Sequence, residues 1–232
     1  KNFPKIYIGK KGMKDEKILR FCKKIKPDLI LVAGWYHLLP EKYLKIAPTY
    51  GFHGSFLPNY RGGAPLVWAL INGEKSTGVS LFKFKSGIDN GDVVFQEKII
   101  ILKSDNIKSI YEKMSKKILT ITKKFLRKFL LNQISFKKIN YANSKIYPQR
   151  SPSDGKIPMS LKAKEMYNFI RAQTKPYPGS FFLYNGKKVF AWKSKILQRK
   201  KSLSRIEFSK KYFYIRCKDK KSVCILDWSY EK

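Results

Sequence analysis

Hydrophobic and polar positions at the start of the chain follow the pattern of a strand, a helix and a second strand. Residues 5–8 form a short β-like run, and residues 15–25 carry apolar side chains at helical spacing. Residues 29–33 (LILVA) are a continuous apolar run, as expected of a parallel strand that is buried on both faces. This βαβ pattern predicts a mostly parallel sheet covered by helices.

Strands and helices continue to alternate after this unit. The pattern predicts strands at 50–53, 79–84 and 93–101, and helices at 41–47, 65–72 and 107–131. The last helix is long and amphipathic, and its outer face is rich in Lys. Because ligands gather outside the C-terminal ends of the strands in such sheets, the loops that follow these strands are expected to meet at one edge.

The second part of the chain has a different character. Residues 140–157 are polar and contain Pro and Ser, which indicates a linker, and residues 160–173 return to helical spacing. Short strands are predicted at 181–184, 188–197, 212–217 and 223–228, with a hairpin turn at Asn185-Gly186 between the first two. We therefore predict a first domain at 1–139, a linker at 140–157 and a small β-rich, OB-like domain at 158–232.

Candidate chemistry is concentrated between residues 51 and 94. His53, one of only two histidines, lies on a segment rich in turn residues, and Asp89 lies in a second loop flanked by glycines. A packed scaffold that brings two such loops together is the usual way to build an acid–base pair. A His in a turn and an Asp in a loop are also common without any chemistry, so this pattern alone leaves both interpretations open.

Three longer motifs surround these two residues. HGSFLPNYRGGAPLVW (53–68), NGEKSTGV (72–79) and GIDNGD (87–92) resemble, in order and spacing, the formyltransferases that use 10-formyltetrahydrofolate. That family includes methionyl-tRNA, glycinamide ribonucleotide and amino-sugar formyltransferases. The resemblance implies a Rossmann-like α/β domain, 10-formyltetrahydrofolate as co-substrate, and His53 with Asp89 as the catalytic pair. It also implies that strands and helices precede Lys1, so this sequence is expected to be a fragment or a shortened variant.

The resemblance implies further site residues in three segments. The loop after the second strand and the loop before Asp89 would form the folate pocket, mostly through backbone groups: Trp35, Tyr36, His37 and Leu38, then Ser86, Gly87 and Ile88. Ordinary packing of the two aromatic residues and a solvated His37 are the alternative. Ser55, Asn59, Arg61 and Gly62 would contact the acceptor substrate, although Arg61 could instead brace its loop.

One position departs from the family pattern. An Asn that donates to the formyl oxygen is expected two residues before the catalytic His, and the chain has Gly51 there. Loss of one such donor can lower the rate by about 10²–10³. Either another donor replaces it (Ser55, Tyr50, a water or the Gly51 N–H), or the enzyme is weak, or the chain is a non-catalytic relative that binds folate or nucleic acid. Because His53 and Asp89 lie in otherwise intact motifs, we expect activity.

Composition narrows the partners only in part. The net charge of +34, from 50 Lys and Arg against 16 Asp and Glu, suits anionic partners such as nucleic acid, nucleotide-sugars, folate polyglutamates or membrane surfaces. A general bias toward Lys would give the same charge. Three cysteines without CxxC spacing, and only two histidines, predict reduced thiols and no metal site. There is no apolar run long enough for a membrane span and no signal-peptide pattern, so we expect a cytoplasmic protein.

The acceptor amine is suggested by the second part of the chain. Residues 149–157 (QRSPSDGKI), 170–172 (IRA) and 176–181 (PYPGSF) are most similar to the amino-sugar branch, which implies the amino group of a nucleotide-linked 4-amino sugar. The high positive charge favours the alternative, initiator methionyl-tRNA, because neutralised phosphates dominate nucleic-acid affinity. The sequence does not indicate an oligomeric state.

Overall fold

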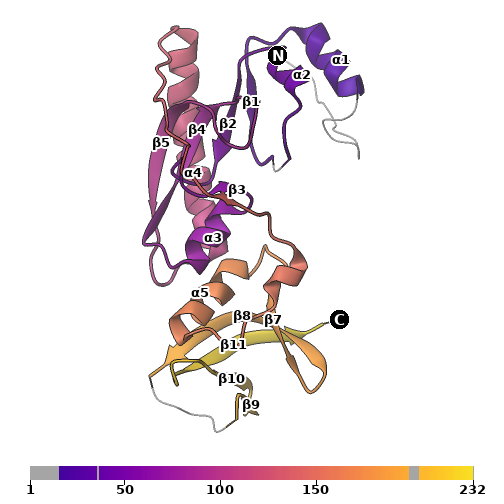
Figure 1. The fold of residues 1–232 in the computed structure, drawn as a ribbon, viewed down its shortest axis with the longest axis vertical. Coiled ribbons are helices and arrows are strands. Elements are labelled where there is room, and N and C mark those ends of the chain that lie inside the picture. The colour runs from indigo at the N-terminus through magenta and orange to yellow at the C-terminus, as the bar shows by residue number, and fades with distance from the viewer. Residues whose placement is uncertain (1–15, 36, 199–203, 232) are drawn as a thin grey trace.

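The computed structural model describes residues 16–35, 37–198 and 204–231. Two sheets lie one above the other in Figure 1, each accompanied by helices and joined by an extended linker. The predicted strand at residues 5–8 lies outside the described residues. The predicted α/β class, in which a sheet with parallel pairing is followed by a β-rich part, is confirmed.

In the described part of the chain, the strands of the first sheet are ordered β1 (Ile30–Val32), β2 (Thr49–His53), β4 (Ser76–Lys83) and β5 (Val93–Ile100). Only β1 and β2 run parallel, whereas β2–β4 and β4–β5 are antiparallel. Among the described strands the sheet is therefore mixed, with one parallel and two antiparallel pairings. The physical reason is local, because β4 and β5 are joined by a short loop, and only antiparallel neighbours can be joined in that way.

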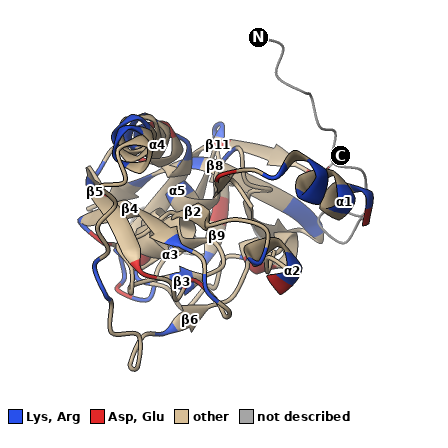
Figure 2. Cartoon of the chain, turned by 90° about the horizontal axis from the view of Figure 1, so that it is seen from above, with Lys and Arg blue, Asp and Glu red and all other residues tan. Residues whose placement is uncertain are grey.

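The described helices that accompany this sheet are α1 (Glu16–Ile25), α2 (Glu41–Leu44), α3 (Pro65–Ile71) and α4 (Ile107–Leu130). The apolar face of α4 packs on the sheet, with Ile121 and Phe125 buried against Tyr50 and Leu81. Its first turn is capped by the side chain of Asn106, which accepts a hydrogen bond from the backbone N–H of Ser109 at 3.1 Å. The outer face carries the Lys-rich stripe predicted from the sequence, visible in Figure 2.

The second sheet is antiparallel throughout its described strands. Its order is β7 (Ser180–Tyr184), β8 (Lys187–Leu197), β11 (Ser222–Tyr230), β10 (Tyr212–Arg216) and β9 (Ile206–Ser209). Helix α5 (Ala163–Gln173) covers it, and Met166 and Ile170 are buried in the same cluster as strand side chains. Asn185 and Gly186 both have positive φ, +49° and +74°, as the predicted two-residue hairpin turn requires.

The linker makes contacts with both parts. Residues Ile146–Tyr147 form β6, which pairs in parallel with β3 (Arg61–Gly62), and a 3₁₀ helix, η2, follows at Pro152–Gly155.

Helices α3 and α5 pack together, and the guanidinium of Arg171 in α5 donates to the carbonyls of Leu102 and Asp105 at 3.0 and 2.9 Å. Within the described residues, no helix is both long and apolar enough to cross a lipid bilayer.

Candidate active site

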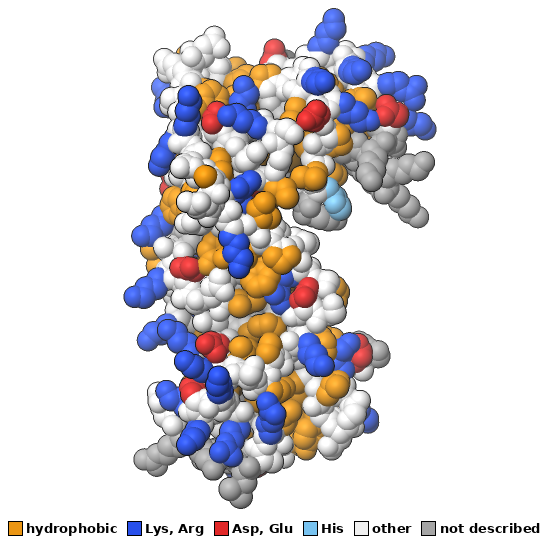
Figure 3. Space-filling model, viewed as in Figure 1, with side chains coloured by type: hydrophobic (Ala, Val, Ile, Leu, Met, Phe, Trp, Pro, Cys, Tyr) orange, Lys and Arg blue, Asp and Glu red, His pale blue; other side chains and the backbone are white. Residues whose placement is uncertain are grey.

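A cavity of about 960 Å³ opens at the C-terminal ends of β1 and β2. The face drawn in Figure 3 is hollowed between its upper and middle parts. The cavity wall includes segments that are far apart in sequence: the stretch after β1, the end of β2, the start of α3, the loop between β4 and β5, part of α4 and the linker. Both His53 and Asp89 line it, so the fold brings the two predicted catalytic residues to one place.

His53 is the last residue of β2, and its side chain is almost completely buried. Its Nδ1 atom lies 3.4 Å from Oδ2 of Asp89. Asp89 adopts a left-handed backbone conformation, with φ of +42°, which directs its loop back toward β2. The same Oδ2 atom accepts a hydrogen bond from the backbone N–H of Gly62 at 2.9 Å. The carboxylate therefore lies between the imidazole and the loop that follows β2.

The other nitrogen of His53 has a partner that fixes its role. Nε2 lies 2.7 Å from the carbonyl oxygen of Tyr60. A carbonyl oxygen can only accept a hydrogen bond, so Nε2 must carry a proton in this arrangement. Nδ1, which faces Asp89, is then the position at which the ring gains or loses its second proton.

Arg61 holds the loops around the site together through its buried guanidinium. Its side chain is buried, and its guanidinium donates to the carbonyl of Ile88 at 3.0 Å and to the hydroxyl of Ser144 at 2.7 Å. The guanidinium carbon also lies 4.8 Å from the centre of the Tyr141 ring. Arg61 thus joins the loop after β2 to the loop that carries Asp89 and to the linker. Of the two roles that the sequence left open, the contacts are those of a brace.

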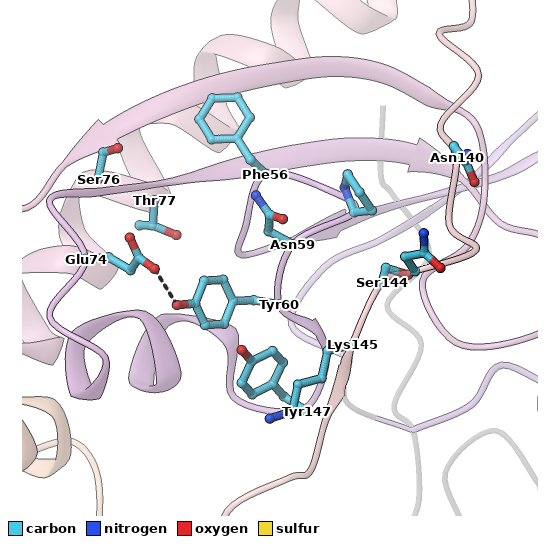
Figure 4. A pocket seen from close by; sticks show the side chains of 12 residues that line it. Phe56, Asn59, Tyr60, Glu74, Ser76, Thr77, Asn140, Ser144, Lys145 and Tyr147 are labelled. Atoms are coloured by element: carbon cyan, nitrogen blue, oxygen red, sulfur yellow. Dashed lines mark hydrogen bonds between the residues drawn. The ribbon is translucent and has the colours of Figure 1, made fainter.

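The other predicted acceptor residues are distributed over two places. Gly62 lines the cavity of His53, whereas Ser55 is fully buried and donates its hydroxyl to the Asn59 carbonyl. Asn59 itself lines a second cavity of about 680 Å³, shown in Figure 4. The two cavities share Tyr147, and the short β3–β6 ladder lies beside both. The contacts of Ser55 therefore hold the loop together and do not reach toward His53.

The predicted folate residues lie together along the His53 cavity. Trp35, Leu38 and Ile88 line it, with the further lining residues His37, Ser86 and Gly87. The rings of Trp35 and His37 are in edge contact, with centroids 5.4 Å apart. Tyr36 lies outside the described residues.

Gly51 is explained by its neighbour. A Cβ atom at position 51 would lie 2.3 Å from Cε2 of the Phe84 ring, far inside van der Waals contact. Phe84 lines the cavity beside His53, so its ring occupies the space that a side chain at position 51 would need. The absence of an Asn side chain at position 51 and the position of the Phe84 ring therefore go together, because the ring fills the space that the side chain would need.

Several residues that line the cavity are not predicted from the sequence. Phe84, Tyr111, Met114, Gln149 and Tyr177 all line the cavity. The hydroxyls of Tyr111 and Tyr177 are 3.3 Å apart, and burial, followed by the contact with Tyr111, raises the pKa of Tyr177. The motif that contains Tyr177 was visible in the sequence, but only the packing of α4 against the 174–179 turn could place it here. In the described part of the chain, no group of three or more His, Cys, Asp or Glu side chains could hold a metal ion.

Comparison with known families covers nearly the whole chain. The formyl transferase family model matches residues 2–125, and the model of the formyl transferase C-terminal domain matches residues 150–232. The bifunctional polymyxin resistance protein ArnA of Wigglesworthia glossinidia brevipalpis is 40% identical over 188 residues, which are 80% of this chain and 29% of that protein. The methionyl-tRNA formyltransferase of Lactobacillus johnsonii is 34% identical over 209 residues, which are 88% of this chain and 66% of that protein.

Two solved structures illustrate the shared fold. Methionyl-tRNA formyltransferase from Clostridium thermocellum superimposes with a TM-score of 0.68 at 22% identity, covering 92% of this chain and 82% of that chain. An N-formyltransferase from Helicobacter canadensis, solved in complex with folinic acid and dTDP-3-aminofucose, gives 0.66 at 21% identity, covering 78% and 68%. The chain spans less than two thirds of the length of the two curated relatives. The two family models, which between them match most of the sequence, show that the chain belongs to the formyl transferase family.

Proposed function

We propose that this chain transfers a formyl group from 10-formyltetrahydrofolate to a primary amine, with His53 and Asp89 as its catalytic pair. One observation carries the proposal: the imidazole and the carboxylate lie 3.4 Å apart on the wall of the 960 Å³ cavity, in a chain of the formyl transferase family. When bound, 10-formyltetrahydrofolate supplies the formyl group.

The pair supplies hydrogen bonding and proton transfer. Nε2–H of His53 is a donor for the negative charge that develops on the formyl oxygen, and a charged acceptor competes well against the neutral Tyr60 carbonyl that holds it at rest. Asp89 stabilises the ring when Nδ1 is also protonated. The two residues can thus pass one proton from the attacking amine to the departing folate nitrogen while the formyl carbon exchanges one nitrogen for the other.

The cavity walls suit a flat heterocycle on one side. Trp35, Phe84 and Ile88 present apolar and aromatic surface, and pockets of this size and lining bury most of a ligand of drug size. Trp35, His37, Leu38, Ser86, Gly87 and Ile88 are the residues that we propose to hold the folate. The proposal keeps the division into a catalytic domain at 1–139, a linker at 140–157 and a C-terminal OB-like domain at 158–232. It also includes a cytoplasmic location, in line with the free thiols of Cys22, Cys217 and Cys224.

For the acceptor we propose the amino group of a nucleotide-linked 4-amino sugar. The motifs at residues 149–157, 170–172 and 176–181, which resemble those of the amino-sugar branch, favour this choice. Initiator methionyl-tRNA is the alternative, favoured by the net charge of +34. A relative that binds folate or nucleic acid without turnover is the second alternative, and it rests on Gly51.

The activity is tested with the chain and 10-formyltetrahydrofolate, measuring release of tetrahydrofolate with UDP- and dTDP-4-amino sugars. We expect turnover that falls by about 10²-fold or more in His53→Asn and in Asp89→Asn, because each removes an acid–base partner. Tyr167→Phe is the control, since the Tyr167 hydroxyl donates to the Lys103 carbonyl at a surface away from the cavity. Folate binding without turnover on any amine would leave the non-catalytic alternative.

The choice of acceptor needs a separate comparison. Methionyl-tRNA is assayed beside the sugar nucleotides, at several salt concentrations, because binding through phosphates weakens steeply as salt rises. Turnover on sugars with little salt dependence supports the proposal. Turnover on methionyl-tRNA alone, lost with rising salt, would favour the first alternative.

A further inference from the structure

Three consecutive residues hold both members of the catalytic pair. The carbonyl of Tyr60 lies 2.7 Å from His53 Nε2, the guanidinium of Arg61 donates to the Ile88 carbonyl, and the N–H of Gly62 donates to Asp89 at 2.9 Å. The position of this tripeptide therefore decides where the imidazole and the carboxylate meet. Its backbone must itself be held in place.

Tyr60 has an unusual backbone conformation. Its φ is +54°, in the left-handed region, which is unfavourable for a residue with a side chain. Such a conformation persists only when the surrounding contacts impose it. Because the carbonyl of Tyr60 is aimed at His53 by this conformation, relaxation of the backbone would also move the hydrogen bond to Nε2.

The side chain of Tyr60 supplies the contacts that hold this conformation. Its hydroxyl donates to Oε1 of Glu74 at 2.7 Å and accepts from Nδ2 of Asn72 at 3.1 Å, and its ring packs on that of Tyr147 with centroids 4.8 Å apart. Figure 4 shows the phenol pointing toward Glu74 across the second cavity. Burial is the main cause that raises the pKa of Tyr60, so the hydroxyl remains a donor over the physiological pH range.

The Tyr60 phenol lines the second cavity, away from the cavity of His53. We propose that Tyr60 is a positioning residue: its phenol, anchored by Glu74 and Asn72, fixes the backbone carbonyl that keeps the proton of His53 on Nε2 and leaves Nδ1 to exchange a proton with Asp89. The inference rests on the proposed function for its kinetic consequence, but not for its effect on the imidazole.

The kinetic test removes the hydrogen bond between the Tyr60 hydroxyl and Glu74 by changing either partner. Tyr60→Phe deletes the hydroxyl, Glu74→Ala deletes its acceptor, and Glu74→Gln keeps an acceptor oxygen. We expect kcat to fall about tenfold in Tyr60→Phe and in Glu74→Ala, with KM for 10-formyltetrahydrofolate changed less than about twofold, and to recover in Glu74→Gln. The double variant should lose no more than either single variant, because both break the same bond. Independent losses that multiply in the double variant would overturn the proposal.

A second readout does not depend on turnover. The chain has only two histidines, so NMR with ¹⁵N-labelled His gives two ring systems, and His37→Gln assigns them. In the wild type we expect the His53 signals of a ring with its proton on Nε2, and a slowly exchanging Nε2–H. In Tyr60→Phe that proton should exchange at least about tenfold faster and the two ring nitrogens should shift.

The outcomes separate this inference from the proposed function. Unchanged His53 signals in folded Tyr60→Phe and Glu74→Ala would overturn the positioning role, even if the enzyme is active. If the wild-type chain shows no turnover and the His53 signals still change in Tyr60→Phe, the positioning role is supported and the proposed function fails. Tyr167→Phe, which loses a phenol hydroxyl bonded elsewhere, should leave the His53 signals unchanged.

Discussion

The two walls of the main cavity are built in opposite ways. The polar wall consists of His53, Gly62 and Ile88–Asp89, which line the cavity, together with Tyr60 and Arg61, which do not line it but hold His53 and Ile88 by hydrogen bonds. The aromatic wall, made of Trp35, Phe84, Tyr111 and Tyr177, is held mainly by packing. Hydrogen bonds fix the positions of individual atoms on the polar wall, whereas packing fixes only the overall shape of the aromatic wall.

This difference indicates that the two walls have different functions. Directional bonds fail when one partner moves by a fraction of an ångström, which suits groups that must transfer a proton. Packing tolerates exchange of one apolar side chain for another of similar volume, which suits a surface that recognises a ring. Changes on the polar wall should therefore affect rate, and changes on the aromatic wall should affect binding.

The largest loss of stability is expected from Arg61→Ala on the polar wall. Removal of the buried guanidinium leaves the Ile88 carbonyl and the Ser144 hydroxyl without its hydrogen bonds, and we expect about 3 kcal/mol less stability together with a rate loss of at least about tenfold. Urea unfolding and the formyl-transfer assay measure both. Arg127→Ala, an exposed arginine on α4, is the matched control and should change neither. Equal midpoints for the two variants would show that the brace is unimportant.

Gly51→Ala tests the packing of the aromatic wall. The added Cβ would lie 2.3 Å from the Phe84 ring, and overpacking of this kind typically costs about 1–3 kcal/mol. In Gly51→Ala/Phe84→Leu the ring is gone, so the cost of the alanine should largely disappear. Urea unfolding of the two single variants and the double variant gives this coupling. Additive losses would mean that the ring is not what excludes a side chain at position 51.

The same pair tests the missing amide donor. Gly51→Asn/Phe84→Leu places an amide beside His53 without the clash, and a rise in kcat over Phe84→Leu alone would show that the wild type lacks this donor. No gain would show that another group already fills the role.

A smaller, pH-dependent effect is expected from Asp105→Asn, which lies outside both walls and serves as a reference. Burial alone would raise the pKa of Asp105, but hydrogen bonds from Lys113, the Leu102 N–H and Ser109 outweigh it and lower the pKa. A lowered pKa contributes stability above the ordinary value near 4, and that contribution is lost as pH falls through the lowered value. The variant should lose about 2 kcal/mol at pH 7, and the difference should shrink below about pH 4. Urea unfolding at several pH values measures it, and a constant difference at all pH values would contradict it.

The smallest effect is expected from Tyr111→Phe. The hydroxyl contact with Tyr177 is long, at 3.3 Å, so its loss should change stability by less than about 1 kcal/mol. If the aromatic wall recognises substrate, KM for one of the two substrates should rise while kcat is kept. A fall in kcat with KM unchanged would place Tyr111 with the polar wall instead.

Most of the elements followed from the sequence because their signals are local. Helix α4 was predicted at 107–131 and lies at Ile107–Leu130, since its apolar spacing repeats over many turns. Strands β3 and β6 were missed, because two residues carry no periodicity and their pairing joins segments far apart in the chain. The short strand β9 was missed for a similar reason, because it contains only four residues and has weak alternation.

The same distinction between local signals and contacts across the fold applies to the site. By itself, the sequence determined the family, through motifs whose order and spacing need no contacts to be recognised, and that resemblance singled out His53 and Asp89 as the expected catalytic pair. Only the tertiary structure decided that Arg61 faces the Asp89 loop, that the Tyr60 carbonyl sets the proton on His53, and that Phe84 fills the space at Gly51. Each of these depends on side chains that meet across the fold, and such distances are fixed by packing and not by spacing along the chain.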